Sequence, residues 1–187
     1  MDHDDVTPDD LLQPVLGQMQ RNDEGALAGL DELVERYGRD ARLHFLRGSL
    51  LAGLERYPEA RIAMEKAVGI APGFDLARFQ LGFLELTSGD VTAAQSTWIP
   101  LLNLPPEDPV KLFVLGLNKM IIDEFDSAIT LLEEGISRNT VLPPLNQNIA
   151  LIVAEIRAKQ VTQDPAQEVE SGANFLLKQY AFKDTKH

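Results

Sequence analysis

The chain has 187 residues, of which 44% are hydrophobic, 25% charged and 6% aromatic, as expected for one soluble globular domain. Its formal net charge of -12 disfavours nucleic acid as a partner, because a polyanion would be repelled over most of the surface. The absence of cysteine excludes disulfides, thiolate metal sites and thiol catalysis. Leucine and alanine supply much of the apolar content, which predicts an all-α fold.

The beginning of the chain is acidic and has no basic or apolar segment of the kind found in secretory signals. No apolar run in the sequence approaches the roughly 18 residues that a membrane span requires. The sequence therefore predicts a cytoplasmic protein with no membrane partner.

The first predicted helix begins near Thr7, whose side chain can cap it, with Pro8 in the first turn. Pro14 then deletes a backbone hydrogen bond to Asp10, so we expect the helix to bend or restart there. A second helix is predicted from the spacing of apolar residues at Ala26, Leu30 and Leu33.

A pattern with a fixed period follows along the chain. It appears in three columns: Gly48, Gly82 and Gly116; Ala60, Ala94 and Ala128; and Met64, Trp98 and Leu132. Pro72 and Pro106 close two of the units in phase, and Thr140 takes that place in the third. Small side chains at a fixed spacing let two helices approach each other closely where they cross.

This pattern resembles the tetratricopeptide repeat family, whose 34-residue unit is a helix-turn-helix with small residues at the helix crossing. In that frame the well-matched units are residues 41–74, 75–108 and 109–142. A degenerate unit at 7–40 precedes them, and an atypical helix pair at 143–183 follows. The resemblance implies a single domain over residues 1–187, an α-solenoid in which about five helix pairs stack as a right-handed superhelix.

Pro100 interrupts the second helix of the unit at 75–108, where it removes an N–H donor and clashes with the carbonyl of Ser96. Two outcomes are open. The helix kinks near Trp98, or it ends at Ile99 and Pro100 begins a loop.

The last pair is expected to contain a helix from Pro143 to about Lys159. A further helix, capped by Asp164 and Pro165, is expected to end near Tyr180. This final unit is longer than the family's, as is common for terminal repeats whose outer faces meet solvent.

The resemblance also implies a concave wall made by the first helices, where positions 2, 5, 9 and 12 of each unit face a ligand. In this sequence those positions are Arg42, Phe45, Ser49, Ala52, Leu76, Phe79, Phe83, Leu86, Val110, Phe113, Leu117 and Met120. Phe45, Phe79 and Phe113 occupy the same position in three units. If these rings are half exposed, they form an apolar patch of roughly several hundred Å², larger than soluble monomers normally leave uncovered.

The leading hypothesis is a scaffold or adaptor that holds an apolar or amphipathic segment of a partner protein in this groove. One alternative is a secretion-type chaperone for apolar substrates. Another is a structural repeat protein that acts through homo-oligomerisation, its groove filled by the last helix with Val169, Phe175, Leu176 and Tyr180. We do not expect the ligand to be the acidic C-terminal tail of a chaperone. Members of the family that bind such tails hold them with a clamp of Lys, Arg and Asn at groove positions, and this chain lacks that clamp.

No catalytic, cofactor or metal site is expected. The histidines, His3, His44 and His187, lack the spacing for metal ligation or a catalytic relay, and we interpret His44 as a packing residue. The sequence contains neither a phosphate-binding glycine loop nor a nucleophile motif. We therefore expect a protein that is not an enzyme.

Overall fold

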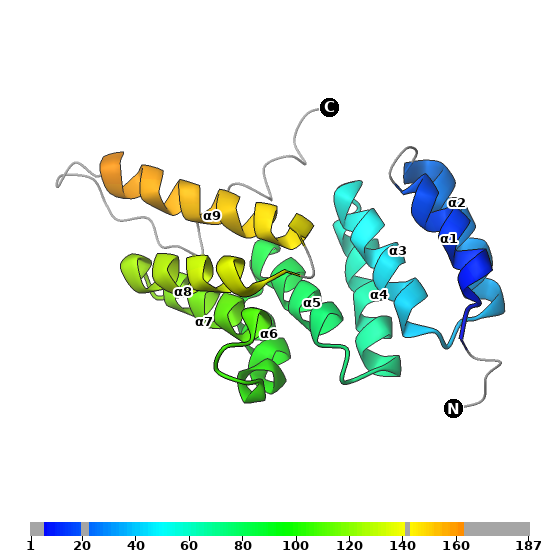
Figure 1. The fold of residues 1–187 in the computed structure, drawn as a ribbon, viewed down its shortest axis with the longest axis horizontal. Coiled ribbons are helices and arrows are strands. Elements are labelled where there is room, and N and C mark those ends of the chain that lie inside the picture. Colours follow the sequence, from blue (N-terminus) through cyan, green and yellow to red (C-terminus); the bar gives the residue numbers. More distant parts are fainter. Residues whose placement is uncertain (1–5, 20–22, 141–142, 163–187) are drawn as a thin grey trace. The chain divides into compact units, whose positions relative to one another are not determined.

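The computed structural model describes residues 6–19, 23–140 and 143–162. These residues form α-helices and one 3-10 helix, with no strand among them (Figure 1), so the all-α prediction is confirmed. Backbone contacts divide the chain into two compact units, Met1–Leu84 and Glu85–His187. The predicted helix that ends near Tyr180 lies outside the described residues.

The division between the units falls within α5, Asp75–Thr87. Ahead of it in the first unit are α1 Asp9–Gln18, α2 Asp23–Arg36, α3 Ala41–Gly53 and α4 Tyr57–Ile70. The second unit continues with α6 Val91–Trp98, the 3-10 helix η2 Ile99–Asn103, α7 Pro109–Ile121, α8 Phe125–Arg138 and α9 Pro143–Thr162.

The first unit has a continuous core. Apolar side chains of α1 to α4 pack together with Leu81 and Leu84 of α5. The first helix contains Pro14 without restarting, in contrast to one of the predicted outcomes. It begins at Asp9, with Pro8 at the N-cap position and no side-chain cap, so the predicted cap by Thr7 is wrong.

Thr7 instead joins the N-terminal segment to the start of α3. Its backbone N–H donates to Oδ2 of Asp40 at 2.9 Å, and Asp40 is only 5% exposed. The other carboxylate oxygen caps α3 by accepting from the N–H of Arg42 at 3.0 Å. The Arg42 guanidinium completes the link, because Nη2 donates to Asp40 Oδ2 and to the carbonyl of Thr7, each at 2.8 Å.

The period of the sequence is repeated in the backbone of the turns between paired helices. Glu55 has φ of 62° and follows α3. Its N–H donates to the carbonyl of Ala52, and the N–H of Arg56 donates to that of Leu51, the two bonds of a Schellman motif. The same left-handed conformation and the same pair of bonds occur at Gly89 and Asp123.

Small residues lie where the paired helices cross, as the sequence indicates. A Cβ placed on Gly48 of α3 would lie 2.9 Å from Met64 Cγ and 3.2 Å from the carbonyl oxygen of Ala60 on α4. A Cβ on Gly116 of α7 would lie 2.7 Å from Leu132 and 3.2 Å from the Ala128 carbonyl oxygen on α8. The absent side chains therefore allow both helix pairs to pack at this distance.

Pro100 marks the point where the second helix of its repeat changes geometry. The α-helix α6 ends at Trp98, and Pro100 lies in the first turn of η2. The structure thus matches the prediction of a helix end rather than a kink, but the segment that follows is a 3-10 helix instead of a loop. Trp98 and Leu101, on either side of the junction, are fully buried.

The helix α9 extends past the point where the earlier first helices stop. Arg157 lies one repeat period after Asp123, yet it is helical and the helix continues to Thr162. α9 therefore runs beyond the predicted end near Lys159 and has no turn at the expected place.

Candidate protein-interaction site

The groove residues predicted on α3 are all half-buried in the first unit. They are Arg42, Phe45, Ser49 and Ala52. On α5, Leu76 and Phe83 are also half-buried, whereas Phe79 is 1% exposed. We call the partly exposed set, with Gln80 added, the α3–α5 face: Arg42, Phe45, Ser49, Ala52, Leu76, Gln80 and Phe83.

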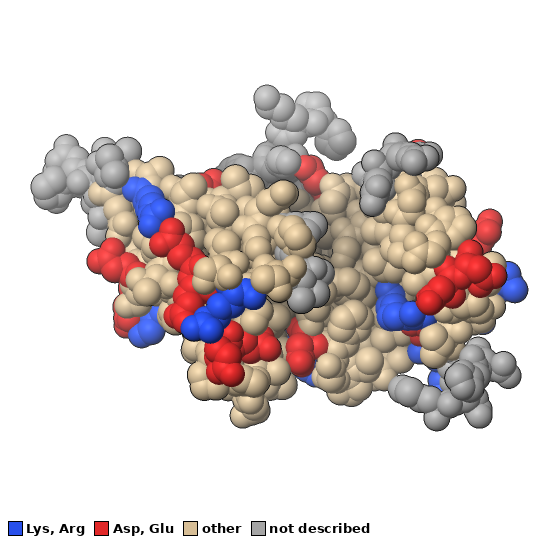
Figure 2. All heavy atoms as spheres, in the orientation of Figure 1, with Lys and Arg blue, Asp and Glu red and all other residues tan. Residues whose placement is uncertain are grey.

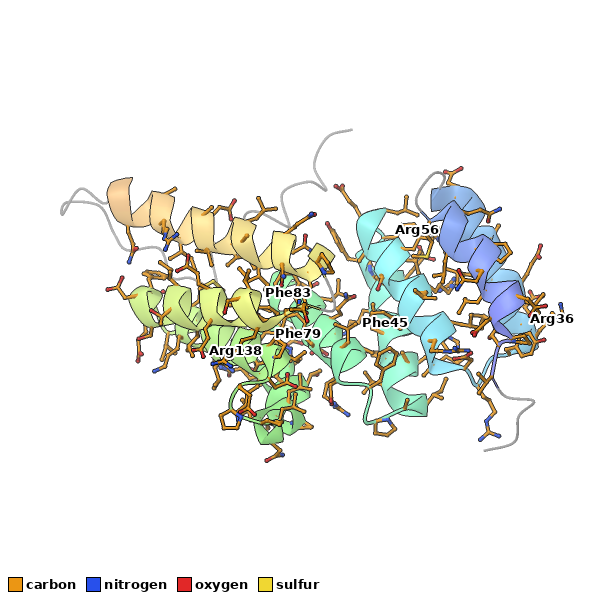
Figure 3. All side chains as sticks on the ribbon, in the orientation of Figure 1. Arg36, Phe45, Arg56, Phe79, Phe83 and Arg138 are labelled. Carbon is orange, nitrogen blue, oxygen red and sulfur yellow. The ribbon has the colours of Figure 1, made fainter. Side chains whose placement is uncertain are left out.

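Aromatic rings give this face a defined apolar surface (Figure 3). The ring of Phe45 packs on Phe74, just before α5, with centroids 4.9 Å apart at an interplanar angle of 47°. Phe79 and Phe83 stack along α5 with centroids 6.3 Å apart. Phe83 is thus supported from beneath by a buried ring, and both rings at the surface are held in place by aromatic neighbours.

A polar pair joins the two helices of the face. The Ser49 hydroxyl donates to Oε1 of Gln80 at 3.0 Å, and both side chains are partly exposed. Gln80 is not among the predicted groove residues, because the period aligns Ser49 with Phe83. Its sequence signal is that it precedes Phe83 by one helical turn, so both lie on the same side of α5.

Arg42 contributes little free charge to the face. Its guanidinium is bound to Asp40 and lies 3.8 Å from a carboxylate oxygen of Asp9. Burial acts to raise the pKa of Asp40, but the hydrogen bonds from Arg42 and from the backbone of Thr7 outweigh it and lower that pKa. Asp40 consequently stays ionised and holds Arg42 in a structural role.

The predicted groove residues of the second unit lie mainly in its core. Leu86, Phe113, Leu117 and Met120 have no measurable exposure, and Val110 is half-buried. The condition for a large apolar patch, half-exposed rings in all three repeats, is therefore not met by Phe79 and Phe113.

Phe113 is buried because of a glycine on the next helix. A Cβ added to Gly135 of α8 would lie 2.5 Å from Cε1 and 2.7 Å from Cδ1 of the Phe113 ring. The ring therefore occupies the space of the missing side chain and packs on the helix backbone.

Within the described ranges, no group of histidine, aspartate and glutamate side chains could hold a metal ion. His44 is 3% exposed, and its Nε2 lies 2.9 Å from the carbonyl oxygen of Gly38. Burial lowers the pKa of His44, so the ring is neutral and Nε2–H donates to Gly38. As predicted, His44 is a packing residue.

Among the residues that the structure describes, no helix is long and apolar enough to cross a membrane.

Helix pairs that recur at a fixed period, with the same turn at Glu55, Gly89 and Asp123, define an α-solenoid repeat protein. Residues 18–73 match the family model of the tetratricopeptide repeat. By sequence, residues 18–73 thus match the tetratricopeptide repeat, and the helix pairs of the chain have the fold of tetratricopeptide repeat proteins. No curated protein matches the sequence.

Solved structures share this fold at low sequence identity. One is residues 41 to the end of MamA from Desulfovibrio magneticus RS-1, 16% identical with a TM-score of 0.58, over 94% of this chain and 96% of that one. Another is YrrB, described as a tetratricopeptide repeat protein with an unusual peptide-binding site. It is 17% identical with a TM-score of 0.51, over 94% of this chain and 83% of that one.

Proposed function

We propose that this protein is a non-enzymatic scaffold that binds an apolar or amphipathic segment of a partner protein on the α3–α5 face. The observation that carries the proposal is the set of partly exposed apolar side chains Phe45, Leu76 and Phe83 on two neighbouring helices. Aromatic side chains bury a large area with little loss of conformational freedom, which makes them frequent anchors at interfaces. The fold supports this function, since repeat proteins commonly present such surfaces to peptides.

The polar pair on the face suits a bound backbone. With Oε1 of Gln80 accepting from Ser49, the two amide N–H groups of Gln80 can donate to main-chain carbonyls of a partner segment. Apolar contacts on either side of these donors would supply affinity, while the amide would fix the position of the segment.

The charge of the face argues for one kind of partner. Arg42 is bound to Asp40, so the face has no free cation for an acidic peptide. The chain as a whole has a formal net charge of -12, which favours basic residues beside the apolar anchor. This contribution acts mainly on the association rate and weakens as salt is added.

A cytoplasmic setting belongs to the same proposal, since a chain without cysteine needs no oxidising compartment.

A peptide-display selection tests the proposal with random sequences in place of a named partner. The library is selected on the wild-type chain, and the enriched peptides are then titrated against Phe45→Ala/Leu76→Ala. Ile62→Ala is the matched control, because Ile62 is an apolar residue of α4 that is 64% exposed and outside the face. Phe79 is unsuitable as a test position because it is buried.

We expect enriched peptides to be apolar with basic flanks, and to bind the double variant at least about tenfold more weakly, as for two modest interface anchors. The Ile62→Ala control should retain full affinity. Circular dichroism must show both variants folded. Equal binding by the folded double variant, or selection of no peptides, would contradict the proposal.

A further inference from the structure

The segment around the 3-10 helix η2 has apolar side chains on two sides. Trp98 and Leu101, three positions apart, are fully buried in the second unit. Ile99 and Leu102 have the same spacing, and they are 61% and 39% exposed. Because a 3-10 helix has three residues per turn, residues with this spacing lie on one side of it. The exposed side and the prolines next to it are called the η2 patch, which consists of Ile99, Pro100, Leu102, Pro105 and Pro106.

The neighbouring helix pairs have a charged residue at the position of Ile99. One repeat period away in each direction, this position is Glu65 in α4 and Glu133 in α8, and both are exposed. The Glu65 carboxylate lies 3.0 Å from the guanidinium of Arg61. The Glu133 carboxylate lies 2.9 Å from that of Arg157. The fold therefore accepts a charged side chain at this position, so core packing does not require an isoleucine in the second unit.

The chain around the η2 patch is acidic. Residues 79–110 contain no Lys or Arg. Glu107, which directly follows the patch, is exposed, and Asp108 caps α7 with its side chain. The next basic residue, Lys111, donates its Nζ–H to the carbonyl of Leu104 at 2.8 Å. Figure 2 shows acidic side chains beside an uncharged surface at the lower edge of the picture, where Figure 1 places α6 and the segment that follows it.

We propose that the η2 patch is a second interaction surface, which binds an apolar segment flanked by Lys or Arg from another protein. Ile99 and Leu102 supply the apolar contacts, and Glu107 attracts the basic flank. The prolines fix the backbone on either side, so little freedom is lost when a segment binds. The patch lies in the second unit, so this inference does not rest on the α3–α5 face. With both surfaces, the protein can hold two segments at once.

The charge and the size of the patch argue against a second copy of this chain as the occupant. Two copies joined through the patch would bring their Glu107 carboxylates together, and like charges in an interface disfavour binding. The five residues of η2 span about 10 Å, so even a patch about 20 Å on each side covers roughly 400 Å². A stable interface of standard size buries about 800 Å² on each partner. A single short segment therefore fits the patch better than a folded subunit does.

A second peptide-display selection, on the full chain, tests the η2 patch separately from the α3–α5 face. The random library is selected on Phe45→Ala/Leu76→Ala, which lacks the apolar anchors of the α3–α5 face. The enriched peptides are then titrated against the wild type and Ile99→Gln. Ile62→Gln is the matched control, because Ile62 is an isoleucine of another second helix, α4, and is 64% exposed.

We expect the enriched peptides to bind Ile99→Gln at least about fivefold more weakly than the wild type, as for one interface anchor. They should bind Ile62→Gln with full affinity, and circular dichroism must show both variants folded. Selection of no peptides, or equal binding by the folded Ile99→Gln variant, would overturn the proposal. A wild-type dimer that Ile99→Gln abolishes in sedimentation would also overturn it and assign the patch to a second copy.

Charge reversal tests the basic flank of the bound segment. Glu107→Lys should weaken binding of the same peptides severalfold at low salt, and the loss should shrink as salt is added. Glu32→Lys is the control, because it changes the net charge equally from an exposed position on α2. Equal effects of the two variants would overturn the role of Glu107. A failure here leaves the peptides of the α3–α5 face unaffected, so the two proposals can fail separately.

Discussion

The helix pairs α3–α4 and α7–α8 have the same turn and the same crossing, but they use the same phenylalanine position differently. Phe113 of α7 is fully buried on Gly135 of α8. Phe45, two repeat periods earlier, is only half-buried and packs on Phe74. The residue of α4 that corresponds to Gly135 is Ala67, which is buried. We attribute the difference to the missing side chain at Gly135, which lets the Phe113 ring pack on the backbone of α8.

This difference shows how a repeat can turn a packing position into a surface position. In these two helix pairs, the position on the second helix that the Phe113 ring covers is glycine in α8 and alanine in α4. The partly exposed Phe45 ring lies in the first unit, where the α3–α5 face is found.

The largest expected effect comes from removing each ring. Phe113→Ala should lower the free energy of unfolding by about 3–5 kcal/mol, because it leaves a cavity in the core. Phe45→Ala should cost about 1–2 kcal/mol, since the ring is partly solvated in the folded protein. Urea titration followed by circular dichroism measures both. Equal losses would show that the two rings are equally buried in solution.

Replacing Gly135 with alanine should destabilise the second unit. Gly135→Ala places a methyl group against the Phe113 ring and should cost about 1–2 kcal/mol, even after the helix propensity gained by alanine is included. Urea unfolding of the variant beside the wild type provides the measurement. A Gly135→Ala variant more stable than the wild type would mean that the ring does not pack on this glycine.

The residues that precede Phe45 and Phe113 differ, and this difference predicts that only the first makes the stability of the protein depend on pH. His44 precedes Phe45, and Leu112 precedes Phe113. Because burial holds the pKa of His44 below its ordinary value of 6.5, the unfolded chain binds the proton more readily. The contribution of His44 is complete above about pH 6.5 and decreases as the pH falls below that value.

Replacing His44 with Leu, the residue of the second unit, should remove this pH dependence. Urea titrations at about pH 8 and about pH 5 would show a smaller loss of stability in the variant than in the wild type. The lowered pKa of Asp40 does not interfere, since its stabilising effect is lost only as the pH falls below the ordinary value of 3.8. Identical losses in the two chains would assign the effect to other groups.

The smallest effect is expected in the turns. Glu55→Gly and Asp123→Gly should each raise the stability by about 0.5–1 kcal/mol, because glycine adopts a positive φ without a steric penalty. The gain should be larger at Glu55, since aspartate tolerates the left-handed region better than glutamate does. Thermal unfolding compares the variants, and a loss of stability at either position would contradict the assigned turn conformation.

The sequence predicts those features of the fold that depend on the spacing of residues along the chain, such as the helix crossings. Gly48 and Gly116 are recognisable as crossing residues from their spacing alone, since the packing they allow requires a small side chain. The burial of Phe113 cannot be predicted in this way, because it depends on Gly135, which lies on another helix. Likewise, the capping potential of Thr7 is visible in the sequence, but its actual partner, Asp40, lies at the start of a later helix.

The link between Thr7 and Asp40 also has a consequence for the order in which the protein folds during synthesis. The ribosome releases the N-terminus first, so α1 and α2 emerge before the carboxylate that binds Thr7. The N-terminal segment gains this anchor only when Asp40 and Arg42 have left the exit tunnel. The first helix pair of the nascent chain is therefore completed by the first turn of the next pair.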